Sequence, residues 1–293
     1  MTTRVICIMG PTGSGKSQLA LSLARQFPAE IISVDSVAIY RGMDIGTAKP
    51  TQKILEEVPH HLINIRDPSE SYSAAEFCRD ATALIKEIIA RQKMPLLVGG
   101  TMLYFKALQE GLSHMPSADE TIRNTITQEA TALGWRALHD RLKLIDEVAA
   151  SRIHPNDAQR IQRALEVFEI TGKPISTLQN GAQSLKEFSY VNLGLGAIDR
   201  KILHDRIEKR FDRMLQENFV DEVKLLFERG DLHPDLPAMR AVGYRQVWAY
   251  LSGNIDFETM RNQAIAATRQ LAKRQMTWLK SWPKALSKNN LYI

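Results

Sequence analysis

Residues 10–17 read Gly10-Pro11-Thr12-Gly13-Ser14-Gly15-Lys16-Ser17, and they directly follow the apolar run Val5-Ile6-Cys7-Ile8-Met9. The octet matches G-x-x-x-x-G-K-[ST], a phosphate-binding loop whose glycines let the backbone wrap around phosphate oxygens. Lys16 adds a positive charge, Ser17 offers a hydroxyl ligand for Mg²⁺, and a helix opening there points its first amides at the anion. We therefore predict that these eight residues bind a phosphorylated substrate.

Strand-like and helix-like segments alternate through the first hundred residues. We expect strands over 4–9, 30–34 and 96–98 and helices over 16–26 and 73–92. This alternation predicts βαβ units and hence an α/β fold, a parallel sheet flanked by helices as in P-loop NTPases. Residues 35–73 form a long irregular stretch, which is typical of a functional loop.

Beyond Gly111 the pattern becomes helical. Helices are expected over 119–133, 135–146 and 157–171, with a turn at 149–153. A β-type run at 190–198 then returns to the sheet, and further helices are expected over 203–218, 221–229, 239–252 and 257–280. We therefore predict a catalytic core of residues 1–112 plus 186–293, interrupted by an all-helical insertion domain at 113–185.

Composition predicts a globular cytoplasmic protein that does not enter a membrane. Hydrophobic residues make up 44% of the 293 residues, but no apolar run approaches the roughly 18 residues of a membrane span. The first strand begins too near the N-terminus to leave room for a signal peptide. Cys7 and Cys78 are interpreted as buried thiols, and His60-His61 as structural or loop-packing residues. The chain is expected to be a monomer because no coiled-coil pattern is present.

Charge is distributed unevenly along the chain. The net charge is +5, yet residues 240–293 alone hold nine basic and two acidic side chains, a net +7. Such a basic C-terminal part favours a polyanionic partner, because Lys and Arg gain affinity by neutralising phosphates. A solvated basic surface remains the alternative on charge alone.

Two predicted strands end in groups able to take part in chemistry. Asp35 follows the strand at 30–34 and is a candidate general base, since ligands of open α/β sheets lie beyond the carboxyl ends of strands; a turn cap is an equally good interpretation. Gly99-Gly100-Thr101 ends the next strand, where many phosphate-loop NTPases carry an acidic Mg²⁺ ligand. Thr101 offers a hydroxyl instead, although a plain tight turn explains these residues equally well. The absence of the acidic residue disfavours an ATP-hydrolysing motor.

Clustered basic residues suggest contacts with phosphates and bases. Arg206 and Arg210 share a helix face and suit a diphosphate clamp, or else a solvated face paired with Asp205 and Glu208. Three further segments mix cations with amide or aromatic side chains, a combination that favours RNA binding over a bland basic surface. They are Gln159, Arg160, Ile161, Gln162 and Arg163; Arg240, Ala241, Val242, Gly243, Tyr244 and Arg245; and Lys273, Arg274, Gln275, Met276, Thr277, Trp278, Leu279 and Lys280.

The whole chain closely resembles bacterial tRNA dimethylallyltransferases. The resemblance is carried by the phosphate loop, by Gly99-Gly100-Thr101, by residues 240–245 and above all by residues 35–50, Asp-Ser-Val-Ala-Ile-Tyr-Arg-Gly-Met-Asp-Ile-Gly-Thr-Ala-Lys-Pro. It implies transfer of a dimethylallyl group from dimethylallyl diphosphate to N6 of the adenine just 3′ of the anticodon, with Mg²⁺ and release of diphosphate.

The resemblance also implies roles for individual residues. Asp35, Ser36, Val37 and Ala38 would meet the target adenine, with Asp35 accepting the N6 proton; the family commonly carries Gln where this chain has Ala38. Thr101 and Arg123 would lie beside the reacting groups, and the three basic segments would grip the tRNA anticodon stem-loop.

Three rival functions stay open at this point. They are an isopentenyltransferase acting on free adenine nucleotides, a small-molecule kinase using ATP, and a non-catalytic tRNA-binding module. The helical insertion and the basic C-terminal part argue against the first, because a mononucleotide needs neither. Asp35, Thr101 and the complete phosphate loop argue against inert binding.

Overall fold

The computed structural model describes residues 4–113, 115–179, 187–196, 198–282 and 285–287. The chain divides into two compact units, Met1–Leu108 with Lys186–Ile293 and Gln109–Leu185, which we call the core unit and the helical unit. The helical unit thus begins four residues before the position expected from the sequence, 113. Among the described residues, no helix combines the length and the apolar character that crossing a bilayer requires.

A parallel sheet of six strands forms the centre of the core unit, which confirms the predicted fold class. Its strand order is β3-β2-β4-β1-β5-β6. The strands are β1 (Arg4–Met9), β2 (Ala29–Val34), β3 (His60–His61), β4 (Met94–Gly99), β5 (Ser189–Gly194) and β6 (Ala285–Ser287). The short strands β3 and β6 were not predicted, because two or three residues carry no periodic signal.

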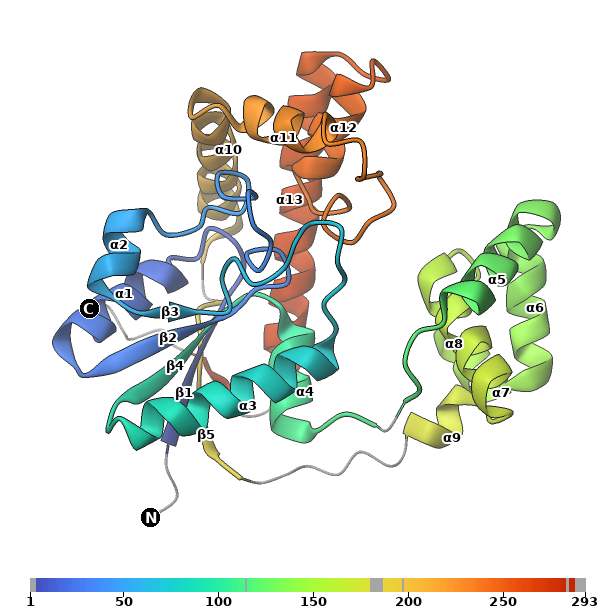
Figure 1. The fold of residues 1–293 in the computed structure, drawn as a ribbon, viewed down its shortest axis with the longest axis horizontal. Coiled ribbons are helices and arrows are strands. Elements are labelled where there is room, and N and C mark those ends of the chain that lie inside the picture. The colour runs from blue at the N-terminus through green and yellow to red at the C-terminus, as the bar shows by residue number, and fades with distance from the viewer. Residues whose placement is uncertain (1–3, 114, 180–186, 197, 283–284, 288–293) are drawn as a thin grey trace. The chain divides into compact units, whose positions relative to one another are not determined.

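Helices cover both faces of the sheet (Figure 1). Alternate strand residues point to opposite faces: Ile31 and Leu96 belong to the cluster that contains Ala20 of α1 (Lys16–Gln26). Ile32 and Leu97 belong instead to the larger cluster with the buried side chains of α3 (Ala74–Ala90). Both faces of the strands are therefore buried, as expected for a parallel sheet.

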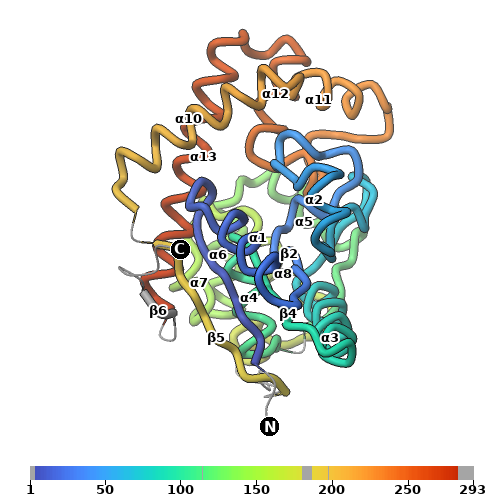
Figure 2. The backbone as a smooth tube through the Cα atoms, turned by 90° about the vertical axis from the view of Figure 1, so that its left-hand side faces the viewer, coloured from blue at the N-terminus to red at the C-terminus, as the bar shows by residue number. Residues whose placement is uncertain are grey.

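The remaining helices of the core unit lie in the connections between strands, four of them between β5 and β6. Figures 1 and 2 show α13 beside α10, and α13 also packs against α12. The helices are α2 (Gln52–Glu57), α4 (Met102–Glu110), α10 (Arg200–Gln216), α11 (Phe219–Phe227), α12 (Tyr244–Leu251) and α13 (Phe257–Lys280).

Three sequence expectations for the core unit are corrected. Residues 35–73 are not wholly irregular, since they contain α2 and β3. The helix α4, in which five of nine residues are buried, was not predicted. The helix predicted over 239–252 begins only at Tyr244, since Gly243 before it has a φ of 94° that no helical residue adopts.

The helical unit contains five helices among its described residues. They are α5 (Glu120–Leu133), α6 (Trp135–Ile145), α7 (Glu147–Arg152), α8 (Ala158–Thr171) and α9 (Ile175–Gln179). Their buried faces form a separate core that includes Ile126, Leu142 and Leu165. The predicted turn at 149–153 is the helix α7, and α9 was not predicted because five residues give no period to read.

A buried carboxylate joins the edge of the sheet to the end of α3. Glu30 at the start of β2 is only 4% exposed, and its oxygens lie 2.7–3.0 Å from His61 Nε2, Arg91 Nη2 and Lys93 Nζ. Burial disfavours the charged carboxylate, but the hydrogen bonds from Arg91, His61 and Lys93 outweigh it and lower the pKa of Glu30 to about 2. His61 is thus a packing residue.

We expect this cluster to make folding stability depend on acid. Because the pKa of Glu30 is lower in the folded state than its ordinary 4.5, its contribution is complete above that pH and is lost as the pH falls towards 2. The free energy of unfolding of the wild type should fall over this range by roughly 3 kcal/mol more than that of Glu30→Gln. Denaturant titrations at several pH values measure this, with exposed Glu56→Gln as control; parallel curves for all three proteins would refute it.

Candidate active site

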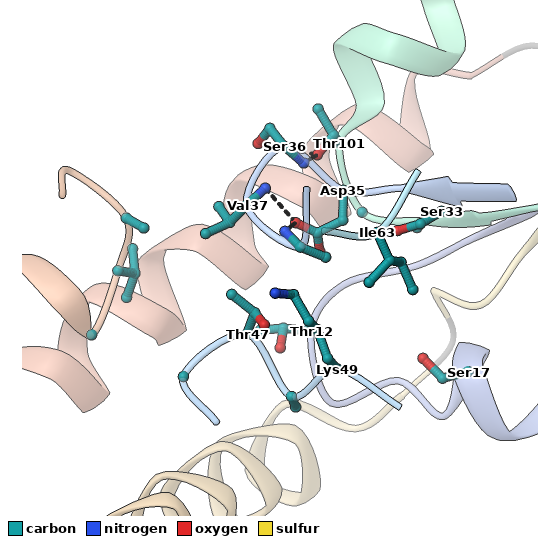
Figure 3. A pocket seen from close by; sticks show the side chains of 18 of the residues that line it. Thr12, Ser17, Ser33, Asp35, Ser36, Val37, Thr47, Lys49, Ile63 and Thr101 are labelled. Carbon is teal, nitrogen blue, oxygen red and sulfur yellow. Dashed lines mark hydrogen bonds between the residues drawn. The ribbon is translucent and has the colours of Figure 1, made fainter. Parts of the chain in front are cut away.

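Three adjacent strands bring their carboxyl ends to one edge of the sheet. In the order β2-β4-β1 they deliver Asp35, Thr101 and the phosphate loop to the same place, although long stretches of sequence separate them. These residues line a cavity of about 740 Å³ within the core unit (Figure 3). The topology alone therefore assembles the site.

The phosphate loop has the geometry of an anion cradle. Gly13 and Gly15 take left-handed φ angles of 80° and 87°, and α1 begins at Lys16. Within the described chain no side chain caps the first turn of α1, so its amides stay open to an anion, and the buried hydroxyl of Ser14 has no hydrogen-bond partner. The local sequence thus produces the predicted cradle.

Lys16 lines the cavity, and its Nζ donates to Pro11 O at 3.3 Å. Burial lowers the pKa of Lys16 to about 8, which the nearby Asp35 carboxylate opposes and the nearby Arg210 guanidinium reinforces. A bound anion would favour the charged amine. Lys16 therefore suits a site that is completed by a phosphorylated ligand.

Asp35 caps a turn and also faces the cavity. Its Oδ1 accepts hydrogen bonds from Val37 N at 2.9 Å and from Ala38 N at 3.3 Å, so it caps the turn that follows β2. Its side chain also lines the cavity, opposite Thr47 and Lys49 in Figure 3. The cap fixes the orientation of a carboxylate that faces the ligand space.

Thr101 is held against the same turn. Its Oγ1 accepts from Ser36 N at 3.1 Å, and its backbone N donates to Val34 O at 3.2 Å. Only glycine fits at position 99, because a Cβ there would lie 1.9 Å from Val34 O. The hydroxyl of Thr101 therefore lies next to the Asp35 turn and within the cavity lining (Figure 3).

The two predicted clamp arginines occupy different positions. Arg210 on α10 lines the cavity and donates from Nη2 to Thr47 O at 3.4 Å. Burial lowers its pKa, while the Asp35 carboxylate acts in the opposite direction. Arg206 is exposed, and its Cβ lies 3.9 Å from the place a Cβ would occupy at Gly13. Both side chains thus lie beside the cradle, with Arg210 the deeper.

Known proteins show which family this chain belongs to. The family model described as IPP transferase matches residues 38–282. The tRNA dimethylallyltransferase of Coxiella burnetii (strain Dugway 5J108-111) is 59% identical over 286 residues, which is 96% of this chain and 91% of that protein. The chain belongs to the IPP transferase family. This confirms the resemblance noted from the sequence.

Solved structures agree with membership of the IPP transferase family. The full-length tRNA isopentenylpyrophosphate transferase of Bacillus halodurans is 40% identical, with a TM-score of 0.69, over 97% of this chain and 89% of that one. A eukaryotic dimethylallyltransferase acting on tRNA is 30% identical, with a TM-score of 0.77, over 95% of this chain and 70% of its own. The fold, as well as the motifs, is that of IPP transferases.

The predicted residues of the helical unit divide into exposed and internal groups. Arg123 and Arg163 both pair with the buried Glu166 carboxylate, at 2.9 and 2.6 Å. Gln162 Nε2 donates to Arg123 O, and Ile161 is fully buried, so the prediction that Ile161 contacts tRNA is wrong. Gln159 and Arg160 are exposed on α8. Only part of this segment is thus available to a partner.

The segment 240–245 borders the cavity, and its two arginines, Arg240 and Arg245, are exposed. Residues Arg240, Ala241, Val242, Gly243 and Tyr244 line the cavity, and Arg245 is exposed. The Tyr244 ring is fully buried and its hydroxyl donates to Glu222 Oε1 at 2.6 Å. The expectation that Tyr244 stacks on an unpaired base is therefore wrong, because neither face of the ring is accessible.

The third segment lies on α13 and has two sides. Lys273, Arg274, Thr277, Trp278 and Lys280 are exposed, whereas Leu279 is buried and cannot contact tRNA as predicted. Met276 and Gln275 are half-buried. Gln275 faces inward, where its amide bonds to both the phosphate loop and Gly100.

Sequence reasoning missed two residues that hold the loop opposite Asp35. Lys49 is 3% exposed, and its Nζ donates to Tyr40 O and, at 2.6 Å each, to Asp44 Oδ1 and Asn64 Oδ1. Its place in the 35–50 block was a usable signal. Glu222 on α11 accepts from the backbone N of Asp44, Ile45 and Gly46 as well as from Tyr244. No local pattern marks Glu222, since its partners lie far away in sequence.

We expect Glu222→Ala to destabilise the core unit. The change leaves three backbone N–H groups and the Tyr244 hydroxyl without their acceptor, which should cost about 3 kcal/mol in the free energy of unfolding. Urea unfolding measures the change. Glu228→Ala, at an exposed position just after α11, should unfold like the wild type; equal losses in the two variants would contradict the role given to Glu222.

Proposed function

We propose that this chain transfers the dimethylallyl group of dimethylallyl diphosphate to N6 of the adenine 3′-adjacent to the anticodon in tRNA, releasing diphosphate. The supporting observation is that Asp35 shares one cavity with a phosphate loop. Membership of the IPP transferase family supports the same reaction.

In the cavity, different residues activate the adenine amine and stabilise the leaving diphosphate. An exocyclic amine is a poor nucleophile, so Asp35 accepts a proton from N6 as the nitrogen attacks the allylic carbon. The carbon–oxygen bond to the diphosphate breaks, and the negative charge that grows on the departing oxygens is met by the amides of the loop, Lys16 and Arg210. Thr101 lines the same cavity, with its hydroxyl held against the turn that contains Asp35.

Magnesium fits this donor set as a metal shared with the substrate. The Ser17 hydroxyl lines the cavity, and the described residues contain no cluster of three His, Cys, Asp or Glu that would cage a metal. Mg²⁺ commonly takes few protein ligands and completes its shell with phosphate oxygens and water. When bound by Ser17, it would neutralise part of the diphosphate charge.

Exposed cations on both units support a tRNA substrate. Arg240, Lys273 and Arg274 are exposed in the core unit, and Gln159 and Arg160 in the helical unit. Such side chains contact RNA phosphates and base edges, and an adenine must leave its stack to enter a cavity. We propose that the helical unit contacts the anticodon stem-loop. The role of Arg123 beside the reacting groups stays a prediction, since within the helical unit its side chain pairs with Glu166.

Labelled substrate tests the proposal against its rivals. Purified protein is incubated with labelled dimethylallyl diphosphate, Mg²⁺ and either bulk tRNA or AMP. We expect label on tRNA adenine and none on AMP. Label on AMP would support a free-nucleotide isopentenyltransferase, and ADP release from ATP without prenyl transfer would support a small-molecule kinase.

A further inference from the structure

One amide side chain joins the two loops that hold the reacting groups. Thr12 N in the phosphate loop donates to Gln275 Oε1 at 3.0 Å, and Gln275 Nε2 donates to Gly100 O at 3.0 Å. Gln275 lies on α13, far from both loops in sequence. Both ends of its amide are therefore used to fix the phosphate loop against the residue that precedes Thr101.

Gly100 provides the space for this bridge. A Cβ at position 100 would lie 2.3 Å from Gln275 Nε2 and 3.2 Å from Gly10 O. The backbone of Gly100 has no positive φ, so what glycine provides here is room for the amide and not a special backbone conformation. An added methyl group would push the end of the flexible Gln275 side chain away.

The same helix presents cations to solvent beside the bridge. Lys273 and Arg274 directly precede Gln275 and are exposed, whereas Gln275 turns towards the cavity and helps to line it. A polyanion bound along α13 and a diphosphate in the cradle would thus act on adjacent residues of one helix.

We propose that Gln275 is a positioning residue: through it, the position of α13 fixes the geometry of the diphosphate cradle and of the Thr101 hydroxyl. The inference rests on the proposed function. Gln275 hydrogen-bonds to Thr12 N and to Gly100 O before the diphosphate binds, and so holds the two loops in fixed positions. This lowers the entropy that the loops lose when the diphosphate binds.

Gln275→Met tests the bridge, because methionine has a similar length and cannot form either hydrogen bond. We expect binding of inorganic pyrophosphate with Mg²⁺, measured by calorimetry, to weaken about 10-fold. The KM for dimethylallyl diphosphate should rise by a similar factor, while the KM for tRNA stays within about twofold. Gln270→Met, the same change at an exposed position of α13, should leave all three values unchanged.

Gly100→Ala disrupts the same bridge from its other end. We expect it to weaken pyrophosphate binding at least as much as Gln275→Met does, because the added methyl group also crowds Gly10 O in the phosphate loop. The double variant should lose little more than Gly100→Ala alone, since both changes remove the same bridge. Losses that multiply would overturn the proposal. So would unchanged pyrophosphate binding with a raised KM for tRNA, which would make Gln275 an RNA contact instead.

The calorimetric measurement separates this proposal from the proposed function. Pyrophosphate binding needs no prenyl transfer, so the double-variant comparison reports on the bridge even if the wild type were to transfer no label to tRNA. A purely structural role for Gln275 would lower the melting temperature and the active fraction but leave the pyrophosphate affinity of the folded protein unmoved, and that result would also overturn the proposal.

Discussion

Replacing Asp35 by Asn is expected to lower the rate of dimethylallyl transfer by about 10³-fold while tRNA still binds. General bases contribute on the order of 10² to 10⁴ in rate, and an uncharged amide cannot accept the N6 proton. The amide oxygen of Asn can still accept from Val37 N and Ala38 N, so the turn after β2 should persist. Single-turnover transfer of labelled dimethylallyl diphosphate and filter binding of tRNA measure the two effects.

Asp205→Asn is the matched control for this experiment. Asp205 is exposed on α10, where it pairs with Lys209, so its loss should leave the transfer rate unchanged. Transfer by Asp35→Asn at close to the wild-type rate would remove Asp35 as the base and leave it only the role of a turn cap.

Replacing Lys16 by Met is expected to raise the KM for dimethylallyl diphosphate about 100-fold and to lower kcat as well. Charge-assisted hydrogen bonds to phosphate are among the strongest in proteins, and the interaction grows as the diphosphate departs. Lys209→Met removes an exposed cation from α10 and serves as control. Steady-state kinetics with varied dimethylallyl diphosphate measure the effect, and an unchanged KM in Lys16→Met would contradict it.

The same lysine predicts a pH dependence. With a pKa of about 8 before the substrate binds, Lys16 is a cation below that pH and becomes neutral above it. The affinity of the wild type for dimethylallyl diphosphate should therefore fall as the pH rises from 7 to 9, by up to about 10-fold per pH unit beyond the pKa. The Lys16→Met variant should lack this fall, and identical profiles in the two proteins would exclude Lys16 as its source.

Local patterns were strong enough to predict most of the core unit. Three elements have the predicted bounds: the strand Arg4–Met9 and the helices Lys16–Gln26 and Phe257–Lys280. The glycine loop marks the end of the strand and the start of the first helix, and Asp256 caps the start of the last helix. The phosphate loop, Asp35 and Thr101 meet because parallel strands end at one edge of the sheet. That part of the site follows from sequence and topology alone.

The residues that hold the loops were not predictable in the same way. Gln275 reaches Thr12 across 263 positions and Glu222 reaches Asp44 across 178, and no spacing rule connects such partners. Tyr244 and Leu279 look like accessible contact residues in sequence, yet both are packed in the core. Whether a side chain in such a segment is buried depends on which face of its helix packs against neighbouring elements. That packing is visible only in the structure.

The most direct test of the account is a crystal structure with Mg²⁺ and a thiodiphosphate analogue of dimethylallyl diphosphate that does not react. We expect diphosphate oxygens within hydrogen-bond distance of Lys16 Nζ and of the amides at the start of α1. The Asp35 carboxylate should face the allylic carbon, with space between them for the adenine amine. An analogue bound outside residues 10–17, or an Asp35 carboxylate turned away from it, would contradict the account.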